Sequence, residues 1–133
     1  MNITSLASDN ITELLSTIVA FTKKRHEVLV TNLQKLNDPE FAPMDLPTNE
    51  FSSAIDHALT QHTLQKRLVL CDSENVKFGP GGSFETSATV DEQCFGLLER
   101  DKDQYIETQI SKLMENSLNQ KLAMELLSQK QHI

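Results

Sequence analysis

The histidines and cysteines are the residue types in this chain that most readily bind metal ions or take part in redox chemistry. His57 and His62 lie five residues apart in a stretch with helical periodicity, so their side chains would point more than about 100° apart around a helix. Because a metal-binding pair on a helix is spaced by four residues, we expect no metal site. Cys71 and Cys94 are the only cysteines, and their separation fits neither a zinc motif nor a disulfide framework. Two free thiols and one disulfide both remain open.

Residues suited to acid–base or phosphate chemistry are present but not grouped. The candidate acids and bases are scattered singly along the chain, at Glu13, Asp45, His57 and Glu107, and no nucleophile–base pair is apparent. The segment 78–84 is rich in glycine but lacks the Lys-Ser/Thr that ends a phosphate-binding loop. We therefore expect a turn there, no cofactor and no enzymatic activity.

The composition points to one small acidic domain spanning residues 1–133. Hydrophobic residues make up 38% of the chain. The net charge of −7 disfavours nucleic acid or an anionic membrane as a partner. No run approaches the ~20 apolar residues of a membrane span, so we expect no membrane insertion. Residues 1–10 lack the features of a signal peptide, which by itself indicates the cytoplasm.

The N-terminal third predicts a long amphipathic helix over 9–38, capped by Asp9 or Asn10. Its apolar residues recur every three to four positions, at Ile11, Leu14, Leu15, Ile18, Phe21, Val28, Leu29, Leu33 and Leu36. Pro39 should end it. The following segment, 39–47, contains further prolines and is expected to be extended and tied down by side chains.

The middle of the chain predicts a second helix over 48–70, capped by Thr48, with residues 68–71 either prolonging it or starting a strand. All four glycines fall between Gly79 and Gly96. We expect irregular structure with some hairpin pairing over 71–100. Two alternatives there are a short helix opened by a capping box from Thr89 to Glu92 and a brief strand through Phe95 and Leu97.

The C-terminal third predicts a helix over 101–131, capped by Asp101 or Asp103. Its apolar residues are expected along one side, at Ile106, Ile110, Leu113, Leu118, Leu122 and Leu126. The predicted fold is mainly α. Its long N- and C-terminal helices pack as an antiparallel coiled-coil-like hairpin, with a shorter second helix and a glycine-containing middle segment in which short strands are allowed.

Both ends of the chain resemble a known family. Asn32, Pro39, Phe41 and Asp45 follow the N-terminal helix at the spacing of a family signature, although Lys35, Asp38 and Glu40 depart from it. The C-terminal pattern runs Glu115-Asn116-Ser117-Leu118, then Leu122, then Leu126-Leu127-Ser128-Gln129-Lys130. Together these residues resemble the bacterial flagellar rod and hook proteins, in particular the FlgB type of the proximal rod.

The resemblance implies a structural subunit that transmits motor torque and assembles through its terminal helices with copies of itself. It also implies the FlgC- and FlgF-type rod proteins, a FliE-type adaptor and the flagellar export gate as partners. Such a subunit is exported without a cleaved signal and resides in the periplasmic rod of the basal body. The expected partner-binding residues are Leu15, Ile18, Leu29, Asn32, Leu33, Pro39, Phe41, Leu113, Leu118, Leu122 and Leu126.

A second interpretation fits the composition equally well. A small acidic cytoplasmic helical adaptor or secretion chaperone would show the same charge and the same helical pattern. It would form a folded dimer of fixed size, whereas a rod subunit would assemble with its neighbours.

Overall fold

The computed structural model describes residues 3–65 and 67–131, with side chains described over 10–65 and 67–130. The protein is mainly helical, with two long helices, α1 (Ile3–Gln34) and α4 (Lys102–Gln131). Helices α2 (Thr48–Gln65) and α3 (Glu92–Arg100) are shorter. The strands β1 (Met44–Asp45), β2 (Val76–Phe78), β3 (Phe84–Thr86) and β4 (Thr89–Val90) and the 3-10 turn η1 (Pro80–Gly82) complete the described elements.

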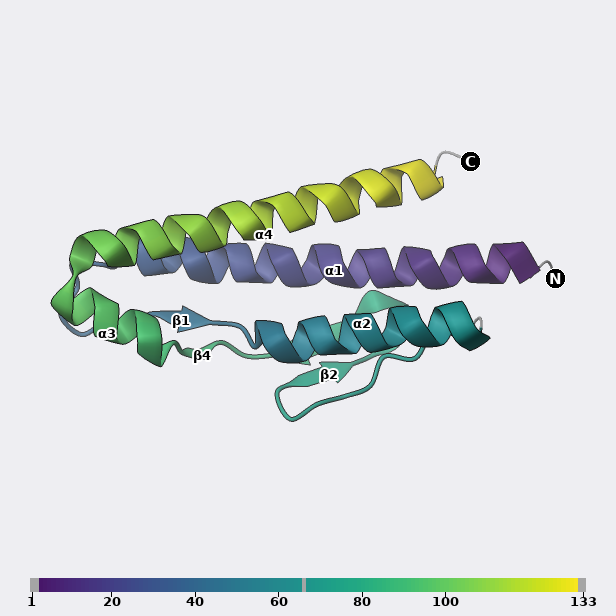
Figure 1. Ribbon diagram of the computed structural model, residues 1–133, viewed down its shortest axis with the longest axis horizontal. Coiled ribbons are helices and arrows are strands. Elements are labelled where there is room, and N and C mark those ends of the chain that lie inside the picture. The colour runs from purple at the N-terminus through teal and green to yellow at the C-terminus, as the bar shows by residue number, and fades with distance from the viewer. Residues whose placement is uncertain (1–2, 66, 132–133) are drawn as a thin grey trace.

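Helices α1 and α4 run side by side in opposite directions, and α2 lies on the other side of α1 (Figure 1). Helix α3 and the β1–β4 pair lie at the end where α1 finishes and α4 begins (Figure 1). Toward the other end, α4 diverges from α1 (Figure 1). The start of α1 and the end of α4 therefore share one end of an elongated molecule.

The main hydrophobic core lies between α1, α2 and the β2–β3 hairpin. It is formed by Leu14, Phe21, Leu46, Phe51, Ile55, Ala58 and Val76. The rings of Phe21 and Phe51 stack with centroids 3.8 Å apart and planes 7° from parallel. Since aromatic rings bury large apolar areas, this pair contributes to holding α2 against α1.

The turn before β3 approaches α1 closely. Gly82 has a φ of +82°, and a Cβ atom there would lie 3.3 Å from the Thr17 hydroxyl. Only glycine combines this backbone conformation with so short an approach. The Lys24 ammonium also donates to the Thr86 carbonyl at 2.6 Å, so the hairpin is held to α1 at two points.

The first two helices differ in length from the sequence prediction. Helix α1 spans Ile3–Gln34 rather than 9–38, so Asp9 and Asn10 lie within it instead of capping it. Its end comes earlier because Asp38 uses its carboxylate to accept from the Glu40 amide, a local turn that competes with helix. Helix α2 spans Thr48–Gln65 rather than 48–70. Residues 67–70 are coil, and Leu68 and Leu70 pack against the core.

The segment 71–100, predicted to be irregular with some hairpin pairing, contains a β-hairpin and, as in one of the two alternatives, a short helix. Strands β2 and β3 pair antiparallel, with Phe78 opposite Phe84. The capping box at Thr89 is wrong, because Thr89 pairs with Asp45 in the β1–β4 ladder. Helix α3 is capped two residues later by Asp91, whose carboxylate accepts from the Cys94 amide at 3.1 Å. The proposed strand through Phe95 is likewise wrong, since Phe95 lies in α3.

Candidate assembly surface

The inner face of α4 is not the one predicted. The side chains buried against α1 are Tyr105, Gln109, Asn116 and Ala123, which recur at helical period. A row spaced by four, such as Leu118 to Leu122, advances about 40° around the helix at each step. The predicted apolar row therefore winds off the inner face, and polar residues take its place.

A cluster of hydrogen bonds centred on Asn32, the Asn32 cluster, joins α1 to α4 and to β1. The Asn32 amide nitrogen donates to the Met44 carbonyl at 2.8 Å and to Gln109 Oε1 at 3.0 Å. The Met44 amide donates to Asn32 Oδ1 at 3.0 Å. Asn32 is 1% exposed, so these bonds form out of water, where an unpaired amide is costly. They hold the segment after α1 against the helix, as expected from its prolines.

Two further bonds continue this polar contact along α1 and α4. The Tyr105 hydroxyl donates to the Asn32 carbonyl at 2.9 Å, and burial raises the pKa of Tyr105 to about 12, so the donor stays protonated. Further along, the Asn116 amide donates to the Thr22 carbonyl at 2.8 Å. Buried polar pairs of this kind favour a single register between two helices, so α4 is fixed lengthwise on α1.

Four charged residues form a cluster that joins α1, β1, the start of α3 and α4. Arg25 donates two hydrogen bonds to Asp45, at 2.9 and 3.0 Å. The Lys112 ammonium lies 3.1 Å from Asp45 and 2.7 Å from Asp91. Burial alone would raise the pKa of Asp45 and of Asp91, but the neighbouring cations and hydrogen bonds outweigh it and hold both pKa values below their usual range. The charge cluster thus fixes the closed end of the helix pair.

This geometry predicts an acid-dependent loss of stability. A carboxyl whose pKa is depressed in the folded state stabilises the protein fully above its ordinary pKa, 3.8 for Asp45, and loses that contribution as the pH falls through the folded-state pKa. Asp45→Asn should therefore lower the free energy of unfolding at pH 7, and its difference from wild type should shrink at pH 3. Urea unfolding at both pH values measures this. An equal difference in unfolding free energy between Asp45→Asn and wild type at pH 3 and pH 7 would contradict a lowered pKa of Asp45 in the folded protein.

The outer face of α4 carries a row of solvent-exposed apolar side chains. This outer stripe consists of Ile110, Met114, Leu118, Leu122 and Leu126, with exposed fractions between 42% and 69%. The residues are spaced by four, so they form a continuous ridge that turns by about 160° around the helix between Ile110 and Leu126. Contiguous exposed apolar patches are uncommon on monomeric proteins and often mark interaction sites, which makes this stripe the candidate assembly surface.

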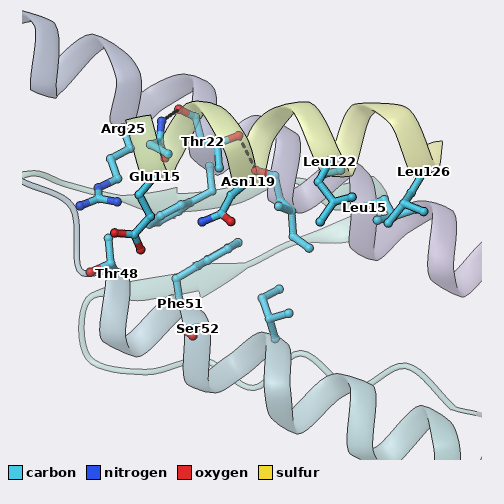
Figure 2. Close-up of a pocket in the computed structure, with 15 residues that line it drawn as sticks. Leu15, Thr22, Arg25, Thr48, Phe51, Ser52, Glu115, Asn119, Leu122 and Leu126 are labelled. Atoms are coloured by element: carbon cyan, nitrogen blue, oxygen red, sulfur yellow. Dashed lines mark hydrogen bonds between the residues drawn. The ribbon is translucent and has the colours of Figure 1, made fainter. Parts of the chain in front are cut away.

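The stripe runs into a groove between α1, α2 and α4 with a volume of about 320 Å³. Its apolar lining includes Leu15 and Ile18 from α1, Phe51 and Ile55 from α2, and Leu122 and Leu126 from α4. Figure 2 shows Arg25, Thr48 and Glu115 at one end and Leu15 and Leu126 at the other. The groove therefore has a polar end and an apolar end.

The structure divides the predicted partner-binding residues into three groups. Leu15, Leu29 and Asn32 are buried within the chain, and Ile18, Leu33, Phe41 and Leu113 are partly buried. Pro39, Leu118, Leu122 and Leu126 are exposed. Only the last group, with Leu15 and Ile18 in the groove wall, lies where a second molecule could reach it.

The hydrophobic pattern of α4 does not reveal the residues that hold it in place. Gln109, Asn116 and Ala123 are spaced by seven, and this heptad repeat of small or amide side chains was a usable signal of an inner face. Arg25 and Lys112 gave no such signal, because their partners lie 20 or more positions away in the chain.

Both cysteines are free, Cys71 exposed and Cys94 buried, and burial raises the pKa of the Cys94 thiol to about 11. Over residues 3–65 and 67–131, no three His, Cys, Asp or Glu side chains gather as metal ligands would. None of the helices in that part of the chain is long and apolar enough to cross a membrane.

Comparison of the chain with protein-family models, with curated proteins and with solved structures found no match. The geometry of the outer stripe and the groove therefore carries the functional argument.

Proposed function

We propose that this chain is a structural subunit of an axial helical assembly, of the flagellar proximal-rod type. In this proposal α1 and α4 act as a coiled-coil-like hairpin that packs against the hairpins of neighbouring subunits. The neighbours are copies of the chain, FlgC- and FlgF-type rod proteins and a FliE-type adaptor at the export gate, and the site is the periplasmic rod.

The observation that carries this proposal is the outer stripe of α4. Met114 and Leu118 are 69% and 68% exposed, although they lie in the middle of a 30-residue helix. Covering such side chains gains roughly 25 cal/mol for each Å² of apolar surface removed from water. A subunit that shares this face with its neighbours gains stability only on assembly, which suits a structural element.

A second observation supports the resemblance to the rod proteins. Two of the residues that carry the resemblance, Asn32 and Asp45, are those that fasten the chain after α1. Asn32 holds Met44, and Asp45 is held by Arg25 and Lys112. If the signature serves to hold the segment after α1 in one position, an amide at 32 and a carboxylate at 45 are needed, because the hydrogen-bonding partners of both side chains are fixed in place.

Mixing the purified protein with the neighbouring rod proteins of its own bacterium tests the proposal. We expect light scattering to show a gain in mass, accompanied by a gain in helical circular dichroism as the helix ends pack. A dimer of fixed size that ignores these proteins would contradict the proposal and favour the adaptor. Adding the FlgC-type protein alone, and then together with the FliE-type protein, identifies which neighbour causes the gain in mass.

A further inference from the structure

Each subunit carries one exposed apolar row and one apolar groove of similar length. The part of the outer stripe outside the groove runs from Ile110 to Leu118, about 12 Å along the helix axis. The α1 wall of the groove runs from Leu15 to Arg25, about 15 Å. Since both surfaces belong to the same rigid helix pair, neither can cover the other within one subunit.

We infer that the Ile110–Leu118 stripe of one copy docks into the groove between α1, α2 and α4 of a second copy, in a head-to-tail contact. This deepens the proposed function and rests on it, because it names the surface through which copies of the chain assemble. A contact between two different surfaces leaves one of each free at the ends and therefore propagates.

The charges at the groove favour one orientation of the incoming helix. At the polar end, Arg25 is already engaged by Asp45, whereas Glu115 forms no ion pair with any residue in the described part of the chain. Lys121 follows Leu118 by one turn on α4. An incoming stripe with Lys121 at the polar end brings this ammonium to Glu115 of the receiving copy, and places Ile110 at the apolar end beside Leu126.

The symmetric alternative pairs two stripes antiparallel about Leu118. Each residue then lies level with the residue at the same distance on the other side of Leu118 in the second copy, so Glu115 lies level with Lys121 and the charges permit this pairing as well. It leaves the apolar groove of both copies exposed to water, whereas docking into the groove covers one apolar surface of each kind at every contact. The groove is therefore the better receiver for the stripe.

Disulfide trapping between two proteins that each carry one introduced, exposed cysteine beside the buried Cys94 tests the contact. Both are made in a Cys71→Ser background, one with Leu118→Cys on the stripe and one with Ser52→Cys on the exposed groove rim. Because a disulfide requires Cα atoms about 4.4–6.8 Å apart, we expect a cross-linked dimer when the two are mixed under mild oxidation, and roughly tenfold less from either alone.

The control replaces Ser52→Cys by Thr60→Cys, which is exposed on the same helix but does not line the groove. Equal cross-linking to Thr60→Cys, or a Leu118→Cys dimer without a partner, would overturn the inference. Lys121→Glu in the stripe protein should reduce trapping, and Glu115→Lys in the groove protein should restore it. Loss of trapping alongside intact mixing with rod proteins would reject this contact and leave the proposed function standing.

Discussion

Asn32→Ala is expected to destabilise the protein by about 3 kcal/mol, because it leaves several buried groups unpaired. The side chain accepts from the Met44 amide and donates to the Met44 carbonyl and to Gln109 Oε1, all within 3.0 Å. Each buried polar group that loses its partner costs about 1–3 kcal/mol, and water has no access to a residue that is 1% exposed. Urea unfolding at pH 7 measures the loss.

Asn37→Ala is the matched control for this substitution. Asn37 is exposed, and its amide oxygen accepts one hydrogen bond, from the Lys102 ammonium. Its removal should change the free energy of unfolding by no more than about 0.5 kcal/mol. If the two variants unfolded at the same urea concentration, the Asn32 cluster would not contribute to the stability of the fold.

The long helices were largely predictable because hydrophobic periodicity is a local signal, whereas most of the predicted caps were wrong: Asp9 and Asn10 lie inside α1, and Thr48 is the first residue of α2. Asp101 caps α4 as expected, since its carboxylate accepts from the Gln104 amide at 3.1 Å. Helix α3 was harder, because its cap, Asp91, is also bound by Lys112 of a distant helix. The sequence around Thr89 and Asp91 gives no sign of the contact between Asp91 and Lys112 that favours Asp91 as the cap.

The packing of α4 was not predictable by counting apolar residues. Leucines at 118, 122 and 126 suggested the face turned toward α1, yet that face carries Gln109 and Asn116. Buried amides there are stabilised by specific partners on α1, which a hydrophobic pattern does not reveal. Because the amides occupy the face toward α1, the three leucines stay exposed and can contact another molecule.

Leu118→Glu should abolish assembly while leaving the subunit folded. Leu118 is 68% exposed, so a charge there stays in water in the monomer and changes its stability by no more than about 0.5 kcal/mol. In an assembly the same carboxylate would be buried in an apolar contact, where an unpaired charge is strongly unfavourable. Circular dichroism and urea unfolding should match wild type, and co-assembly with the rod proteins should be lost.

Leu64→Glu provides the matched control, since Leu64 is 73% exposed on α2 and lies outside the outer stripe. Leu118→Met should behave as wild type, because it keeps the side chain apolar at similar volume. Together these variants separate a loss of contact at α4 from a general effect of added charge.

The most direct test of the proposed rod-type function is swimming by a flagellated bacterium that encodes this chain, after its gene is deleted and replaced by each variant. The account predicts full motility with wild type, Leu64→Glu and Leu118→Met, and none with Leu118→Glu at equal protein level. Unimpaired swimming with Leu118→Glu, or in the deletion strain itself, would contradict it.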